Sequence, residues 1–197
     1  MAVEEAARES PLPDLTLERY EEIRRGEILV FEETFESEDG KDAGRAKAYA
    51  YFAQPWPTIW AIVTDYDKQR EYMPRLTTSR IIKREGNEVW VRFEMEVLWV
   101  DLAWVIKYEK DRTAHRIRFA LDHSYREVNT IDDTEGSWEL IPVEGGDATV
   151  VVYRLFVDTG YAVPDFVMSY LTRGDLPNVV GNLRKRVESG GSWKKGD

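Results

Sequence analysis

Alternation of apolar and polar residues runs through most of the chain from about Leu76 to Asp158 and limits the folds that it can adopt. The clearest run places apolar residues at every second position, namely Val89, Val91, Phe93, Met95 and Val97. A period of two is typical of a strand with one buried face. Similar runs follow, with short turn segments between them. The pattern predicts consecutive antiparallel strands with an aromatic inner face.

Helical spacing replaces this pattern in three segments. The first is a short helix over residues 16–24, with Thr16 as its cap and Gly26 as its stop. The second lies between Pro55 and Pro74, and the third extends from about Pro164 to Ser189 with a kink at residues 174–177. Between the first two segments, residues 27–36 and 44–52 read as strands.

One face of the second of these strands has only small side chains, at Ala46, Ala48 and Ala50. Small side chains leave space for another element to lie close to the strand. We expect a helix to occupy this space.

The chain has 197 residues, of which 43% are hydrophobic, and this is enough for one domain with a substantial core. It has no Cys and only two His, so disulfides, thiolate nucleophiles and Cys- or His-rich metal sites are excluded. We expect no metal and no cofactor. No apolar run reaches the roughly 20 residues of a membrane span. The N-terminus resembles no signal peptide, so we expect a cytoplasmic protein unless such a signal has been removed.

Negative charge is concentrated near the N-terminus. Residues 1–42 contain 14 acidic and 5 basic side chains, which leaves the remainder of the chain almost neutral although the total is -10. Because no basic stripe is present, we expect no nucleic-acid partner. We therefore divide the chain into an acidic extension (1–42), a folded domain (43–189) and a flexible tail (190–197). A role of the extension in binding a partner protein is one interpretation, and simple solvation is the other.

Three local features each allow two interpretations. The chain must reverse near the apolar residues Leu98–Val100, which either pack under another element or form an apolar lip beside a pocket. Asp65 and Asp67 resemble a carboxylate pair, but their place at a helix end favours capping. Basic residues 184–186 suit the C-terminal end of a helix, and a transient membrane contact is the alternative.

Several segments together resemble the START-like, or SRPBCC, superfamily. They are AQPWPTIWAIVTDYDKQREYMPRL, EGSWELIPV, GGDATVVVYRLFVDTG and VPDFVMSYLTRGDLPNVVGNLRKRV, and the last three are similar to the polyketide cyclase/dehydrase and coenzyme Q-binding branch. The resemblance covers about Gly44 to Val187. The chain departs from the pattern at Gln54, where Ala is usual, and in its acidic extension.

This resemblance implies an α+β helix-grip fold, in which a curved antiparallel sheet wraps around a long C-terminal helix and leaves a cavity between them. Proteins of this superfamily mostly bind apolar molecules such as lipids, quinones, polyketides and steroids. We therefore expect a carrier or sensor of a hydrophobic small molecule. A polyketide cyclase or dehydratase that uses the same cavity is the alternative, because fold alone does not fix chemistry.

The alternation pattern identifies the side chains that would line such a cavity. On the strands they are Phe93, Met95, Leu102, Trp104, Ile106, Tyr108, Phe119, Leu121, Trp138, Tyr153 and Leu155, and on the C-terminal helix they are Phe166, Val167 and Tyr170. Each of them is also a normal core residue, but as a set they match the apolar character of ligand sites.

A catalytic role would require an acid and a base. His123 is the candidate proton acceptor, and Arg126 or Tyr153 could stabilise a developing enolate. The segment around His123 also reads as an ordinary polar loop. The sequence contains no phosphate-binding loop, catalytic triad or dinucleotide fingerprint.

Overall fold

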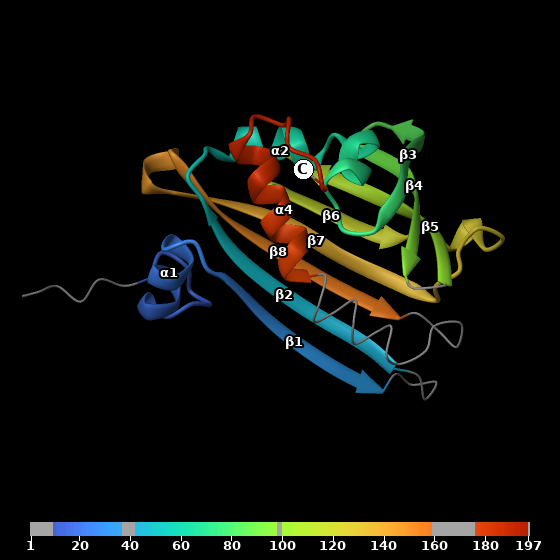
Figure 1. Ribbon diagram of the computed structural model, residues 1–197, viewed down its shortest axis with the longest axis horizontal. Coiled ribbons are helices and arrows are strands. Elements are labelled where there is room, and N and C mark those ends of the chain that lie inside the picture. The colour runs from blue at the N-terminus through green and yellow to red at the C-terminus, as the bar shows by residue number, and fades with distance from the viewer. Residues whose placement is uncertain (1–9, 37–41, 98–99, 159–175, 197) are drawn as a thin grey trace, which may run out of the picture.

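The computed structural model describes residues 10–36, 42–97, 100–158 and 176–196, and within them one curved antiparallel sheet dominates (Figure 1). Its eight strands lie in the order β1-β2-β8-β7-β6-β5-β4-β3. Their bounds are β1 Ile28–Glu36, β2 Asp42–Phe52, β3 Leu76–Glu85, β4 Glu88–Val97, β5 Val100–Asp111, β6 Arg116–Leu121, β7 Asp133–Val143 and β8 Ala148–Asp158. The antiparallel strands predicted from the alternation are therefore confirmed, as is the α+β helix-grip class.

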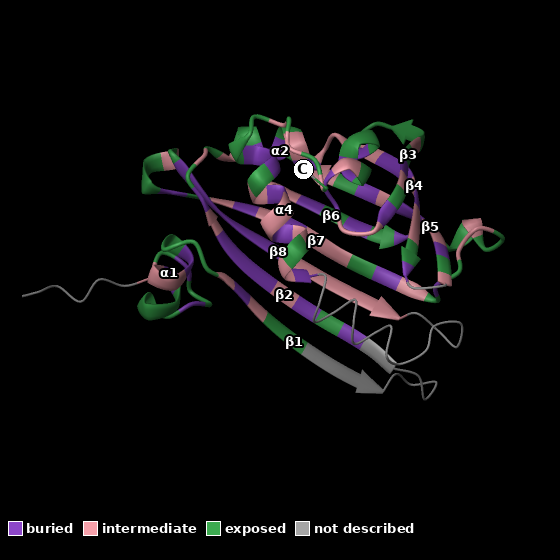
Figure 2. Cartoon of the chain, viewed as in Figure 1, coloured by how far each residue is buried: buried purple, intermediate pink, exposed green. Residues whose placement is uncertain are grey.

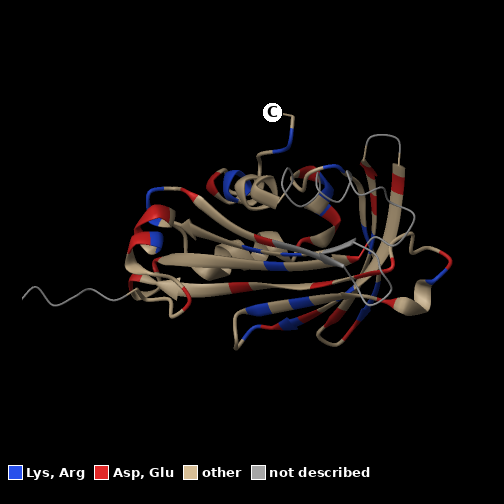
Figure 3. Ribbon diagram, turned by 90° about the horizontal axis from the view of Figure 1, so that it is seen from below, with Lys and Arg blue, Asp and Glu red and all other residues tan. Residues whose placement is uncertain are grey.

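Helix α4, Leu176–Glu188, lies across the inner face of the sheet (Figure 1; Figure 3 gives a second view). It contacts β1 and β2, where the inner side chains are those of Ala46, Ala48 and Ala50. All three alanines are buried, and so are Val180 and Leu183 of the helix (Figure 2). The helix expected over the alanine face is thus confirmed, because only small side chains let a helix backbone approach a strand this closely.

Helix α2, Trp56–Val63, and the 3-10 helix η1, Tyr66–Glu71, connect β2 to β3. The apolar side chains of Ile59 and Val63 on α2 are buried, and they belong to the same core as α4. The capping role predicted for Asp65 and Asp67 is wrong. Asp65 forms an ion pair with Lys68, whereas the carboxylate of Asp67 accepts a hydrogen bond from the backbone N–H of Ile81 at 2.8 Å.

The outer face of the sheet has a second apolar cluster under helix α1, Leu17–Arg24. Tyr20 and Ile23 of the helix pack there against Tyr49 of β2 and Val152 of β8, among other residues. The boundary that the sequence suggests at residue 42 falls within the paired strands β1 and β2. Residues 10–36 therefore belong to the same folded unit as the rest of the sheet, because they complete its edge and cover part of its outer face.

Residues 190–196, which we call the C-terminal strap, fold back from α4 onto the junction between η1 and β3. The sequence predicts a flexible tail here, but the strap makes specific bonds. The ammonium group of Lys195 donates to the carbonyls of Leu76 at 2.6 Å and Met73 at 3.0 Å. Its backbone N–H donates to the carbonyl of Glu71 at 2.8 Å. The strap thereby ties the start of β3 to the end of α4.

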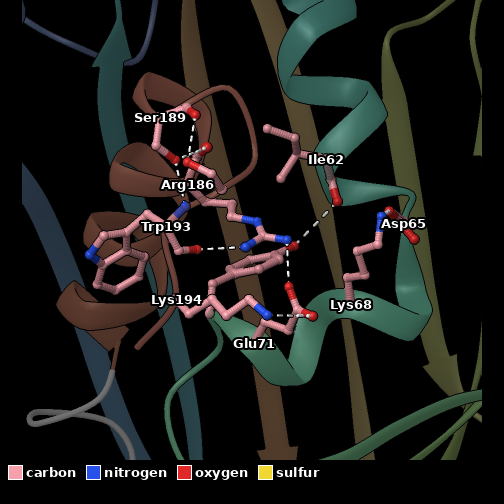
Figure 4. Close-up of polar contacts among 10 residues, drawn as sticks. Ile62, Asp65, Lys68, Glu71, Arg186, Ser189, Trp193 and Lys194 are labelled. Carbon is pink, nitrogen blue, oxygen red and sulfur yellow. Dashed lines mark hydrogen bonds and ion pairs between the residues drawn. The ribbon is translucent and has the colours of Figure 1, made fainter. Parts of the chain in front are cut away.

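Arg186 anchors the strap (Figure 4). Its guanidinium group donates to the carbonyl of Trp193 at 2.6 Å and to the carboxylate of Glu71 at 2.6 Å, and Lys194 lies 3.5 Å from the same carboxylate. Arg186 is only 4% exposed, so this ion pair is largely shielded from solvent. Burial raises the pKa of Glu71, but the hydrogen bond from Arg186 and the charge of Lys194 outweigh this effect and hold it below its ordinary value.

Two other predicted features fall at the edge of what the structure describes. Strand β4 ends at Val97 and β5 begins at Val100, and these two residues are paired, so the reversal occurs where it was predicted. Leu98 and Trp99 of the predicted apolar tip lie outside the described residues. The same holds for residues 164–175 of the predicted C-terminal helix and for its kink.

Replacement of Ile23 tests whether α1 is part of the folded unit. Ile23 is fully buried in the outer cluster, whereas Leu17 on the same helix is 36% exposed. We expect Ile23→Ala to lower the free energy of unfolding by about 3 kcal/mol, because it leaves a cavity in a packed cluster. Leu17→Ala should change it by less than about 0.5 kcal/mol. Urea unfolding of both variants measures the difference, and equal effects would contradict the integration of α1.

Replacement of Arg186 tests the strap. We expect Arg186→Met to lower the free energy of unfolding at neutral pH by about 3 kcal/mol, because it leaves Glu71 without its shielded partner. Lys185→Met is the control on the same helix turn, since Lys185 is exposed and contacts the strap only through its ammonium group, 5.0 Å from the ring centroid of Trp193. It should change the free energy by less than about 1 kcal/mol.

The effect of Arg186→Met should also depend on pH. A carboxylate whose pKa is lowered in the folded state stabilises the protein above its ordinary pKa of 4.5 and loses this contribution as the pH falls through the folded value. The difference between the wild type and Arg186→Met should therefore shrink in acid. Urea titrations at neutral pH and below pH 4.5 measure it, and a difference that is independent of pH would contradict the role assigned to Glu71.

Candidate functional site

A cavity of about 180 Å³ lies between the inner face of the sheet and the start of α4. Its walls come from strands β3 to β8, from the segment between η1 and β3, and from Leu176 and Val179 of α4. The position follows from the fold, because α4 covers the small side chains of β2 and leaves the larger ones of the neighbouring strands to enclose space. Pro74 and Leu76 form one side of the cavity, where Lys195 of the strap bonds the chain.

A row of aromatic rings crosses the sheet at the cavity. Tyr66 packs on Tyr108 with ring centroids 4.4 Å apart, Tyr108 lies 5.8 Å from Phe119, Phe119 lies 6.1 Å from Tyr153, and Tyr153 stacks on Trp138 at 4.1 Å. The strand register explains the row, since Tyr108 is paired with Phe119, and Trp138 with Tyr153. Cross-strand aromatic pairs of this kind are favourable, so the row holds its rings in fixed positions.

Gly136 of β7 makes room for the centre of this row. It is paired with Phe119, and a methyl group added at Gly136 would lie 2.4 Å from the Phe119 ring and 2.1 Å from the carbonyl oxygen of Arg154. Any side chain at this position would therefore clash with the ring and with the neighbouring strand. The glycine lets the Phe119 ring lie close to the backbone of β7.

The polar groups of the cavity are few. Thr134 and Gln69 line it, but the Thr134 hydroxyl donates to the carbonyl of Phe156 at 2.7 Å, and the Gln69 amide donates to the carbonyl of Val63 at 2.9 Å. Tyr108 and Tyr153 also line it, and burial raises the pKa of both phenols. Among the described lining residues there is no carboxylate, imidazole, ammonium or guanidinium group.

The predicted strand residues of the cavity lie together. The structure places these ten at the cavity: Phe93, Met95, Leu102, Trp104, Ile106, Tyr108, Phe119, Trp138, Tyr153 and Leu155. Leu121 is buried in the same core but does not line the cavity, because it lies at the end of β6. Phe166, Val167 and Tyr170 lie outside the described residues. That the ten residues bind a ligand stays a prediction.

The sequence interpretation missed the lining residues that come from irregular segments and strand ends. They are Gln69, Met73, Pro74, Leu76, Ile131, Thr134 and Val157, together with Leu176 and Val179 of α4. Pro74 had been identified only as the end of a helical segment. No periodic signal marks Gln69 or Met73, because they follow the turn geometry of η1 and not a strand.

The three candidate catalytic residues are not brought together. His123 begins an exposed 3-10 turn after β6, with its ring 3.4 Å from the carboxylate of Asp133. Arg126 follows the same turn and is exposed, and neither residue lines the cavity. Only Tyr153 does. The structure therefore does not bring the candidate acid–base set together at the cavity.

Charged residues on the strands are of both signs (Figure 3). Glu139 on the outer face accepts hydrogen bonds from Arg116 at 2.8 Å and from Arg154 at 2.7 Å. Burial raises the pKa of Glu139, but these two arginines outweigh it and lower the pKa below its ordinary value. The charge of Glu139 is thus balanced by its two arginine neighbours.

In the described parts of the chain, no helix is long and apolar enough to cross a membrane. Within the same residues, no group of three or more His, Cys, Asp or Glu side chains is arranged to hold a metal ion.

Solved structures with the same fold come from distant proteins. A STAR-related lipid transfer protein from Xanthomonas axonopodis is 16% identical, with a TM-score of 0.67 over 82% of this chain and 93% of that one. The Zhui aromatase/cyclase from a Streptomyces species is 16% identical, with a TM-score of 0.57 over 84% and 99%. Human StAR-related lipid transfer protein 5 is 14% identical, with a TM-score of 0.61 over 87% and 92%. At such identities the likeness shows the fold alone.

Sequence comparison gives the family. No curated protein sequence matches the chain. The family model described as polyketide cyclase/dehydrase and lipid transport matches residues 53–184, which is more than half of the chain and extends from the start of the α2 segment into α4. The chain therefore belongs to the polyketide cyclase/dehydrase and lipid transport family.

Proposed function

We propose that this protein binds a hydrophobic small molecule in the cavity and acts as its carrier or sensor. The observation that supports this most directly is the cavity itself, an apolar space that the described residues leave beside their packed core. Protein interiors are normally close-packed, and an unfilled space of this size is costly to the folded state. A space retained in a family described by cyclase/dehydrase activity and lipid transport is best explained by a ligand.

The size of the cavity suggests the size of the ligand. The described residues bound about 180 Å³. An engineered protein cavity of about 150 Å³ accepts benzene. A molecule of one or two rings, or the end of a longer apolar chain, therefore suits the space enclosed by Trp104, Ile106 and Leu155.

The chemistry of the lining favours binding over acid–base catalysis. General acid–base catalysis requires a group that exchanges a proton near neutral pH. The only titratable side chains among the described lining residues are Tyr108 and Tyr153, and burial raises the pKa of both phenols away from neutrality. They therefore stay protonated, and can donate hydrogen bonds but not act as bases.

A pair of neighbouring substitutions tests the proposal. Met95 lines the cavity and is half-buried, whereas Glu96 beside it is exposed. We expect organic extraction and native mass spectrometry to find an apolar molecule bound to the wild type. In Met95→Trp the indole fills the space, so occupancy should fall at least about tenfold, a loss of ~1.4 kcal/mol in binding. Glu96→Trp should retain the occupancy of the wild type.

Circular dichroism and thermal unfolding would show that both variants fold. A wild-type protein that is empty after purification and shows no thermal shift with a panel of fatty acids and quinones would refute the proposal. Equal occupancy in Met95→Trp and Glu96→Trp would show that the ligand binds outside this cavity and would contradict the proposed site.

A further inference from the structure

Two tyrosine hydroxyls at the cavity have no hydrogen-bond partner within the described part of the chain. Tyr108 and Tyr153 both line the cavity and are only 6% and 8% exposed. The hydroxyl of the adjacent Tyr66 is fully enclosed and unpaired, whereas those of Tyr108 and Tyr153 are not enclosed in this way. Their phenol oxygens therefore remain open to the cavity.

A buried polar group without a partner is unfavourable, and native proteins seldom retain one without a reason. Phenylalanine would fill the same places in the aromatic row without this cost. Thr134 and Gln69, the other polar side chains among the described lining residues, donate to backbone carbonyls. Tyr108 and Tyr153 share with Tyr66 a donor that the described residues do not use, but Tyr66 does not line the cavity.

Both hydroxyls are held in place before any ligand binds. Tyr153 is stacked on Trp138 at 4.1 Å, and Tyr108 packs at a tilt on Tyr66 at 4.4 Å, so neither ring can turn freely. Phe119 lies between them, with its ring centroid 5.8 Å from that of Tyr108 and 6.1 Å from that of Tyr153. A molecule bound over Phe119 therefore has a tyrosine on each side. Donors fixed in this way lose little entropy when they bind.

We infer that the ligand is an apolar molecule with oxygen atoms that accept hydrogen bonds, such as carbonyls, and that Tyr108 and Tyr153 donate to them. The inference rests on the proposed function and makes it more specific. A pure hydrocarbon would leave both donors without a partner. A ligand with a carboxylate is a poor match, because no cation lies among the described lining residues to balance its charge.

Two probes of nearly equal shape test this inference. Acetylnaphthalene has a carbonyl where ethylnaphthalene has a methylene group. We expect the wild type to bind acetylnaphthalene about tenfold more tightly, since a hydrogen bond to its carbonyl distinguishes the probes. The double variant Tyr108→Phe/Tyr153→Phe should lose this preference and bind ethylnaphthalene at least as well as the wild type. Probe fluorescence measures both affinities.

A spectroscopic measurement on the wild type does not depend on how the variants fold. The carbonyl stretch of acetylnaphthalene bound to the wild type should lie at a lower frequency than in an apolar solvent. In the double variant the stretch should return to the frequency measured in the apolar solvent. Tyr125→Phe is the matched control, because Tyr125 lies on the 3-10 turn after β6 and does not line the cavity. It should behave as the wild type.

The outcomes separate the two proposals. Equal binding of both probes by the wild type, with an unshifted carbonyl stretch, would overturn the inference and leave the proposed function standing. Failure of the protein to bind either probe, together with an empty protein after purification, would overturn both.

Discussion

The close approach of α4 to the alanine face of β2 is the contact on which the arrangement of this molecule depends. Val180 and Leu183 of the helix are fully buried against this region, and each such side chain contributes roughly 1.5–3 kcal/mol. Because the inner face of β2 has small side chains at Ala46, Ala48 and Ala50, the helix settles at that side of the sheet. The inner side chains of β4 to β6 are bulkier, and α4 does not pack on them in the same way. The cavity is a consequence of this uneven distribution of side-chain size.

A fold with a cavity in its core must gain stability from contacts elsewhere. Two such sets of contacts are present here, one apolar and one polar. On the outer face, α1 adds an apolar cluster around Ile23 and Tyr49. On the inner side, the strap adds directional polar contacts that join Arg186 to Glu71. Hydrophobic burial supplies stability with little geometric preference, whereas a shielded ion pair fixes the distance between α4 and the junction of η1 and β3.

The sequence predicts those parts of the structure whose apolar residues recur with a regular period. Period-two alternation located the strands, and therefore ten cavity residues including Trp104 and Tyr153, because alternate residues must share one face. It missed Met73 and the strap, since their positions depend on single long-range bonds such as those of Lys195 with backbone carbonyls. It also placed His123 in a candidate catalytic set, because residue type alone does not reveal which way a turn projects.

The aromatic row gives the cavity a rigidity that bears on what it can recognise. A flexible apolar pocket accepts many ligands, since its side chains can repack around each of them. Here the rings of Tyr108, Phe119 and Tyr153 restrain one another across neighbouring strands, and Gly136 leaves room for the Phe119 ring between the two tyrosines. Selection by such a site comes from polar groups at fixed positions more than from apolar area, which any hydrophobic molecule can satisfy. The two tyrosine hydroxyls are therefore the groups through which this cavity can distinguish one apolar molecule from another.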